Sequence, residues 1–165
     1  MSPYSKPKQA FGLLCWLLLS YATSAIGAIA SIQAKSFYGA LAQPEWAPPP
    51  WLFGPVWTTL YGLMAIAAWL VWRTGGFSAN RLALSCFLVQ LVLNAIWSWL
   101  FFAWQMGAVA LADIVVLWLA ISATLVLFWR VRPIAGILLV PYLLWVSFAG
   151  VLNYALWQLN PQILG

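Results

Sequence analysis

Residues 44–61 read PEWAPPPWLFGPVWTTLY, and no other part of the chain combines rigidity with so much aromatic surface. Five prolines alternate there with large rings, namely Trp46, Trp51, Phe53, Trp57 and Tyr61. Proline fixes φ and lacks a backbone N–H, so the first half of the stretch cannot lie inside a helix. Tryptophan and tyrosine have an apolar body and one polar tip, which suits a membrane–water boundary or the mouth of a cavity. We therefore predict a stiff loop that leads into an apolar helix.

The composition on either side of this loop is that of a membrane protein. Of 165 residues, 65% are hydrophobic and only 5% are charged, whereas a soluble domain carries about 25% charged residues. The few charges separate apolar runs, and about 20 apolar residues suffice for a helix to cross a bilayer. We predict a single all-α domain over residues 1–165, an integral membrane bundle of five transmembrane helices with a Pro/Trp-rich loop between helices 1 and 2. The expected spans are 10–32, 53–72, 82–104, 107–129 and 134–157.

The basic residues predict how this bundle is oriented. With five spans the two termini lie on opposite sides, and of the seven Lys and Arg residues only Lys35 falls on the side away from the N-terminus. The positive-inside rule then places the N-terminus in the cytoplasm. The other six do not form the clustered basic face that nucleic-acid binding requires, so we expect no nucleic-acid partner. They are Lys6, Lys8, Arg73, Arg81, Arg130 and Arg132.

The first span has two interpretations. Its basic N-terminal flank, its apolar run and the small residues 28–30 resemble a cleavable signal peptide. The apolar run is, however, about twice as long as a usual signal-peptide core. It also carries a face of small residues that suits close helix packing in lipid, formed by Ser20, Ser24, Ala28 and Ser31. We favour a retained helix.

The chain contains few groups that could perform catalysis. It has no histidine, the residue that most often acts as general base or metal ligand near neutral pH. Its two acids are Glu45 in the loop and Asp113 in the fourth span, and its two cysteines, Cys15 and Cys86, have no metal-type spacing. We therefore expect no metal site and no acid–base catalysis, which leaves binding by shape, stacking and hydrogen bonds.

Two of the predicted helices carry polar and aromatic residues along one face. Intervals of three and four residues keep such side chains on a single stripe of a helix. An unpaired amide is costly in hydrocarbon, so each stripe faces either a neighbouring helix or a cavity, and periodicity leaves both open. The stripes are Gln90, Asn94, Trp97, Phe101 and Trp104 in the third span, and Tyr142, Trp145, Ala149, Leu152 and Asn153 in the fifth.

Asp113 and Pro141 lie inside predicted spans, where an acid and a proline are unusual. Asp113 is the one acid within a span, and such acids often mark transport or proton paths. No second titratable group is available for a relay, so we favour hydrogen bonds to backbone donors, to Asn94 or to an indole. Pro141 lies inside an apolar run, where it should kink the fifth helix or end a turn of it.

Several motifs together resemble the translocator protein family. They are PEWAPPPW and GPVWTTLY in residues 44–61, Asn94-x-x-Trp97 with Phe101-Phe102, Gln105-Met106-Gly107 with Asp113, and PYLLWVSFA and LNYALW in residues 141–157. Their order and spacing match the family over nearly the whole chain. Bacterial members are called tryptophan-rich sensory proteins and mammalian ones peripheral benzodiazepine receptors. The chain is similar to a bacterial-type member. A helical bundle fits an inner membrane on physical grounds, but some relatives have been assigned to outer membranes, so both membranes stay open.

The resemblance implies a five-helix bundle, commonly a homodimer, with a pocket closed by the loop between the first two helices. It implies no obligatory cofactor, but ligands such as protoporphyrin IX, haem, sterols, and isoquinoline or benzodiazepine compounds. Trp57 and Trp145 match tryptophans that are linked in bacterial relatives to light-dependent porphyrin breakdown. Carried over by position, the pocket residues are Trp46, Trp51, Phe53, Trp57, Asn94, Trp97, Trp145, Phe148, Ala149 and Leu152, and we add Tyr61 and Phe101 from the same aromatic stretches.

The chain departs from the family in two respects. The sterol motif proposed for the fifth helix requires a Lys or Arg after Tyr154, and residues 155–159 contain none. A basic C-terminal tail is also missing, so porphyrin propionates would pair with Lys35 or with backbone and indole donors. We expect a membrane receptor or carrier for tetrapyrroles. The alternatives are a light- and oxygen-dependent porphyrin-degrading enzyme, a transporter of sterols or other hydrophobic compounds coupled through Asp113, and an assembly subunit whose stripes only pack.

Overall fold

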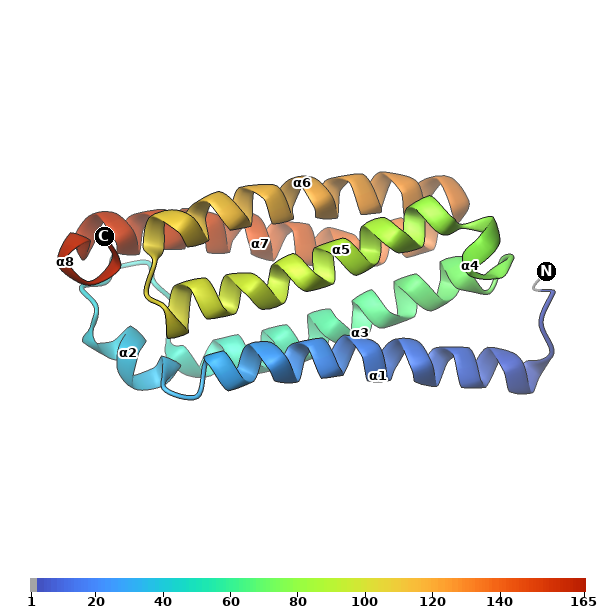
Figure 1. The fold of residues 1–165 in the computed structure, drawn as a ribbon, viewed down its shortest axis with the longest axis horizontal. Coiled ribbons are helices and arrows are strands. Elements are labelled where there is room, and N and C mark those ends of the chain that lie inside the picture. The colour runs from blue at the N-terminus through green and yellow to red at the C-terminus, as the bar shows by residue number, and fades with distance from the viewer. Residues whose placement is uncertain (1–2) are drawn as a thin grey trace.

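The computed structural model describes residues 3–165 as a bundle of long, nearly parallel helices (Figure 1). The long helices are α1 (Lys6–Ala30), α3 (Phe53–Trp72), α5 (Arg81–Ser98), α6 (Gly107–Val131) and α7 (Pro133–Leu159), and α5 continues into a π-helical turn, η2 (Trp99–Ala103). Five helical segments are long and apolar enough to cross a membrane. The predicted all-α bundle with five spans is confirmed. The start of the first helix differs from its predicted bound, residue 10, because α1 begins at Lys6. Pro7 does not prevent this start, since proline is tolerated in the first turn of a helix.

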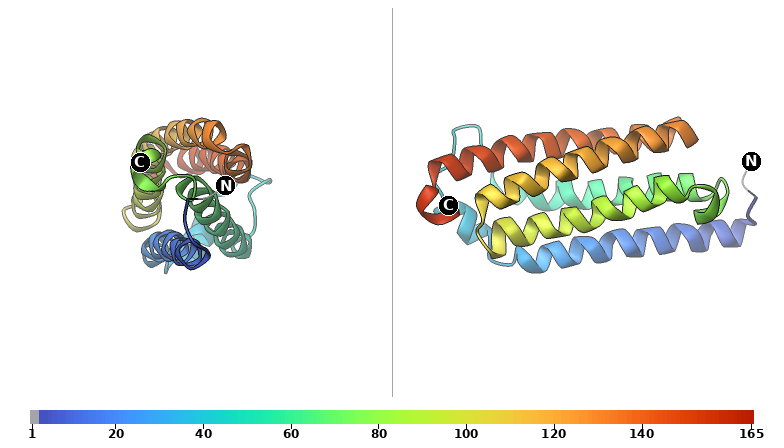
Figure 2. Two further views of the ribbon diagram at one scale, coloured as in Figure 1. Left: turned by 90° about the vertical axis from the view of Figure 1, so that its right-hand side faces the viewer. Right: turned by 45° about the horizontal axis from the view of Figure 1, so that its top comes forward.

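The five long helices close into a ring. Each packs against two neighbours in the order α1, α3, α7, α6, α5 and back to α1, as the end-on view in Figure 2 shows. The tightest corner is the turn from α6 into α7, which Arg132 alone connects. Gly136 allows this approach, since a Cβ there would lie 2.9 Å from Cβ of Trp129. Helices far apart in sequence, such as α1 and α5, therefore meet around a common interior.

The two ends of the bundle differ in charge. The N-terminus and α4 (Gly76–Ala79) lie at one end, and α2 (Ala34–Ala40), α8 (Pro161–Leu164) and the C-terminus lie at the other (Figure 1). The six basic residues other than Lys35 flank helix ends at the N-terminal end, as the sequence predicts. The cytoplasmic placement of this end stays a prediction.

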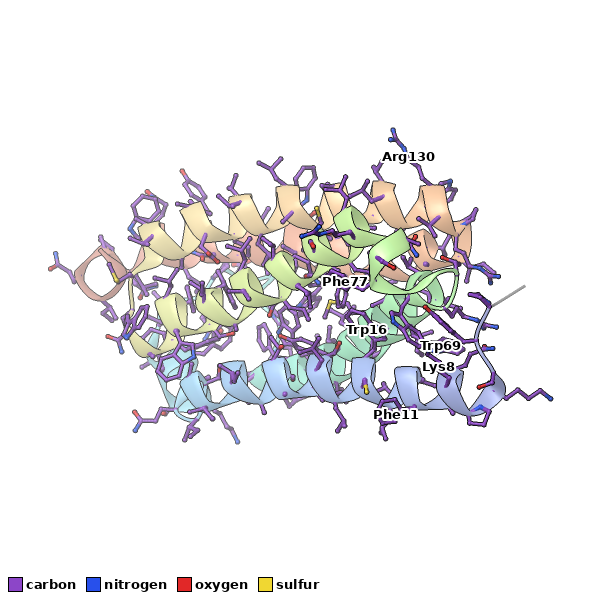
Figure 3. All side chains as sticks on the ribbon, turned by 45° about the vertical axis from the view of Figure 1, so that its right-hand side comes forward. Lys8, Phe11, Trp16, Trp69, Phe77 and Arg130 are labelled. Carbon is purple, nitrogen blue, oxygen red and sulfur yellow. The ribbon has the colours of Figure 1, made fainter. Side chains whose placement is uncertain are left out.

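The interior is packed most densely in the half near the N-terminus. Met64, Phe87 and Phe128, from three different helices, are each 0% exposed there. A second, smaller apolar cluster lies near the opposite end and includes Phe101, Leu152 and Leu156. Large apolar side chains also cover the outside, as lipid contact requires. Figure 3 shows Phe11 pointing away from the bundle and Trp16 pointing into it, and their exposed fractions are 68% and 8%.

The connection between α1 and α3 is only partly a loop. It contains α2 and a single 3₁₀ turn, η1 (Pro50–Leu52), which leads directly into α3 at Phe53. The segment between them, residues 41–49, is irregular and carries three of the prolines. The stiff segment predicted before an apolar helix is therefore present, with helical turns at both of its ends.

Two expectations concern the single helices α7 and α1. Helix α7 runs unbroken from Pro133 to Leu159 with Pro141 inside it, so the alternative that the proline ends a turn is wrong, while the alternative that it kinks the helix stays a prediction. Neighbouring helices support the chain there, because α7 packs against both α3 and α6. Helix α1 is a member of the ring and contacts α3 and α5, and its retention in the mature protein stays a prediction.

Candidate ligand-binding cavity

A cavity of about 340 Å³ lies inside the ring at the end that carries α2. Four helices, α1, α3, α5 and α7, form its walls, while α2, η1 and η2 border its mouth. Ligand pockets usually measure about 300–1,000 Å³ and have mostly apolar walls with a few convergent polar groups. This cavity fits that description, since its wall is largely aromatic and aliphatic with a small number of hydroxyl, amide and ammonium groups.

Tryptophan rings from three helices form the sides of the cavity. Trp57 comes from α3, Trp97 from α5 and Trp145 from α7. Trp97 donates its indole N–H to Oδ1 of Asn153 at 3.1 Å, which fixes that ring in place. In the part of the chain that the structure describes, the indole N–H groups that donate hydrogen bonds belong to Trp69, Trp97 and Trp118, and not to Trp57 or Trp145. These two half-buried indoles therefore offer both a flat face and an available donor to a ligand.

A chain of hydrogen bonds forms the floor of the cavity. The hydroxyl of Tyr61 donates to Oδ1 of Asn94 at 2.7 Å, and Nδ2 of Asn94 donates to the hydroxyl of Tyr142 at 2.8 Å. The three residues come from α3, α5 and α7 and are all buried. No residue deeper in the bundle than Tyr61 and Asn94 lines the cavity. The floor is thus polar but internally satisfied, so it does not demand a polar ligand group.

Helix α1 supplies the fourth wall with small side chains only. They follow the same face of the helix: Ser24, Gly27, Ala28 and Ser31. From the sequence, we expect this face of small residues to be a surface for close helix packing. The face packs closely at Gly27, where a Cβ would lie 3.1 Å from Oγ of Ser98 on α5, and its residues also line the cavity. Small residues on one wall therefore provide room opposite the aromatic walls.

The connection over the mouth is tied down by hydrogen bonds at two places. The hydroxyl of Tyr38 donates to the carbonyl of Pro48 at 3.1 Å, and burial raises the pKa of this hydroxyl. Asn160, just after α7, pairs with both backbone groups of Ala42: the Ala42 N–H donates to Oδ1 at 2.8 Å, and Nδ2 donates to the Ala42 carbonyl at 2.9 Å. The amide side chain thus replaces a backbone partner and fastens the connection to the far end of the chain.

The structure brings seven of the twelve predicted pocket residues into the cavity wall. These seven are Phe53, Trp57, Tyr61, Asn94, Trp97, Trp145 and Ala149. Phe148 lies behind the wall, with its ring centroid 5.5 Å from that of Trp145, and Trp46 packs edge-on against Phe148 at 5.9 Å. Ligand contacts themselves stay a prediction for all twelve.

The remaining three predicted residues lie away from the wall. Trp51 is 71% exposed on the outer surface of η1. Phe101 and Leu152 are buried in the apolar cluster near the mouth, where Phe101 stacks on Trp97 at 5.4 Å. Phe101 therefore supports the wall residue Trp97 from behind. The sequence prediction included Phe101 because the spacing of a helical stripe does not distinguish a residue in the wall from one that packs behind it.

Asp113 does not play the hydrogen-bonding role expected of it. Asn94 is already engaged by Tyr61 and Tyr142, and none of the hydrogen bonds among residues 3–165 joins Asp113 to an indole. Its Oδ2 atom is buried without a hydrogen-bond partner. Helix α6, which carries Asp113, contributes nothing to the cavity wall. The expectation of a bond to Asn94 or to a tryptophan is therefore wrong.

Comparison with known proteins agrees with this architecture. The sequence model of the TspO/MBR family matches residues 13–158, which include the long helices almost entirely and all of the cavity wall. The chain belongs to the TspO/MBR family.

Relatives of this TspO/MBR protein come from all three domains of life. It is 44% identical to protein CrtK of Rhodobacter capsulatus over 140 residues, which cover 83% of this chain and 85% of that one. It is 46% identical to the tryptophan-rich protein TspO of Chlorobaculum tepidum over 130 residues, 78% and 82% of the two chains. It is 40% identical to the human translocator protein over 126 residues, 75% of each chain. The archaeal TspO of Archaeoglobus fulgidus is 40% identical over 126 residues, 76% and 81% of the two chains.

We expect the substitution Asn160→Leu to loosen the connection over the mouth. Both backbone groups of Ala42 would lose their partner, and a lost hydrogen bond of this kind costs about 0.5–1.5 kcal/mol. Amide hydrogen exchange in residues 38–46, followed by mass spectrometry, should accelerate by about tenfold relative to wild type. The control is Gln162→Leu, an exposed amide nearby that makes none of these bonds. Unchanged exchange in Asn160→Leu would show that other contacts hold the connection.

Proposed function

We propose that this TspO/MBR protein is a membrane receptor or carrier that binds tetrapyrroles such as protoporphyrin IX and haem in the cavity. The observation that carries the proposal is the pairing of Trp57 and Trp145, which line the same cavity from adjacent helices and make no indole hydrogen bond within the described part of the chain. A large planar macrocycle offers the complementary surface, namely flat apolar faces and polar groups at its edge.

The magnitudes of the expected interactions are sufficient for micromolar binding. Each aromatic contact contributes about 0.5–1.5 kcal/mol beyond the burial of apolar area. Buried apolar area adds about 25 cal/mol per Å², and association costs about 4–15 kcal/mol of lost freedom. A micromolar dissociation constant corresponds to about −8 kcal/mol. Several aromatic contacts and a buried macrocycle can supply that net value, without any acid–base group or metal ligand.

Family membership supports one part of the proposal, a receptor-type role in a membrane. Relatives carry the names tryptophan-rich sensory protein and translocator protein, which describe sensing and translocation rather than a chemical reaction. A receptor-type role in a membrane therefore agrees with both the fold and the family. The identity of the ligand rests on the chemistry of the cavity.

Protoporphyrin IX is expected to bind the purified protein in the dark with a micromolar dissociation constant. The double substitution Trp57→Phe/Trp145→Phe should weaken binding by about tenfold, because two stacking faces shrink and two donors are lost. The shift of the porphyrin absorption band is the suitable measurement, since it does not depend on the substituted tryptophans. The matched control is Trp104→Phe/Trp129→Phe, which also removes two indoles but from exposed positions outside the cavity.

The outcomes of this titration separate the candidate ligands. Equal weakening in both double variants would place the porphyrin on the lipid-facing surface and contradict the proposal. Absence of saturable binding would remove the tetrapyrrole as ligand. Displacement of a bound isoquinoline or cholesterol probe from the same cavity would then identify a synthetic-ligand or sterol site instead.

A second candidate function is light- and oxygen-dependent porphyrin degradation. The observation that favours it is the position of the same two indoles, because an electron-rich ring beside an excited porphyrin can be oxidised by the oxygen species that form. We expect the porphyrin band to bleach faster under light and air in wild type than in Trp57→Phe/Trp145→Phe at equal porphyrin occupancy. Equal bleaching in both, at the rate found in empty micelles, would leave only the receptor function.

A further inference from the structure

Lys35 is the single charged side chain that lines the cavity. It belongs to α2, at the mouth, and its side chain is exposed. The chain has only two acids that could neutralise it. Glu45 lies in the connection and Asp113 on α6, and neither lines the cavity. Among the residues that the structure describes, Lys35 has no ion-pair partner.

The other basic residues are too distant to share this position. They lie at the opposite end of the bundle, and α1 alone is 25 residues long, or about 37 Å at 1.5 Å per residue. Charges in solution are screened beyond about 8 Å at physiological ionic strength. Lys35 is therefore the one basic residue close enough to act at the mouth, and the acid nearest to it in sequence, Glu45, lies in the same connection without lining the cavity.

The polar groups of the cavity are arranged unequally along its depth. At the floor, the amide of Asn94 uses both its oxygen and its nitrogen on tyrosine hydroxyls. On the α1 wall, the hydroxyl of Ser31 donates to the carbonyl of Gly27 at 3.0 Å. The three ammonium protons of Lys35 have no such internal acceptor. A ligand thus meets a satisfied amide at the floor, neutral indole donors on the aromatic walls, and a single cation at the mouth.

We propose that Lys35 is a specificity-determining residue that selects ligands carrying a carboxylate at the edge of a flat apolar body. This inference rests on the proposed function and names the ligand class more narrowly, as free porphyrin acids rather than neutral tetrapyrroles. The apolar macrocycle occupies the aromatic part of the cavity, and its propionate reaches the ammonium group at the mouth. Charge-assisted hydrogen bonds of this kind are shorter and stronger than neutral ones.

The test compares protoporphyrin IX with its dimethyl ester, which has the same macrocycle but no charge on the propionates. Both are titrated against wild type, Lys35→Gln and Lys35→Arg in zwitterionic phosphatidylcholine nanodiscs, with the porphyrin absorption band as readout. The control is Arg130→Gln, which removes a cation that points away from the bundle at the other end (Figure 3).

We expect wild type to bind the free acid about three- to tenfold more tightly than the ester, the range for a partly exposed charge pair. Lys35→Gln should lower the affinity for the acid to that for the ester and leave the ester unchanged, while Lys35→Arg should keep the preference. Higher salt should weaken binding of the acid in wild type but not in Lys35→Gln.

Two results would overturn the inference while the proposed function stands. One is equal affinity of wild type for acid and ester, and the other is an equal loss of both ligands in Lys35→Gln, which would indicate a structural role. If neither compound bound wild type, the proposed function itself would fail. If Arg130→Gln abolished the preference as Lys35→Gln does, general surface charge would account for it instead.

Discussion

The hydrogen-bond chain from Tyr61 through Asn94 to Tyr142 is the constraint on which the rest of the interior depends. Polar groups in a bilayer have no water to bond with, so a buried amide must find its partners inside the protein. Asn94 finds them on two other helices, which fixes α3, α5 and α7 relative to one another at one level. On the N-terminal side of this level the bundle is solid, and on the other side the same helices enclose a cavity. The position of the cavity is thus a consequence of where this amide lies.

Much of this arrangement follows from the sequence, because membrane helices leave strong local signals. Composition and the length of apolar runs predict the five spans, and the prolines before Phe53 predict where α3 begins. The stripe spacing places Asn94 and Trp97 correctly on an inward face, since an amide cannot face lipid. The distribution of basic residues likewise matches the two ends of the bundle.

The remaining features depend on contacts between segments far apart in sequence. The small residues of α1, such as Ser24 and Ala28, have the same pattern whether a helix or a cavity faces them, and only the ring order decides. Asn160 looks like an ordinary residue after a helix, yet it pairs with Ala42, 118 positions away. Pro141 is a local signal against a continuous helix, yet α7 continues through it where it packs between two neighbours. Each of these requires knowledge of neighbours that periodicity does not contain.

The central claim is that the space between Trp57 and Trp145, under the connection and above Asn94, is where the ligand binds. An experimental structure of the protein in nanodiscs with protoporphyrin IX bound tests it most directly. We expect density for the macrocycle between those two indoles, with a propionate edge toward Lys35. Density on the outer face between α1 and α5, next to the exposed side chains of Ile26 and Val92, with the inner cavity empty, would contradict it.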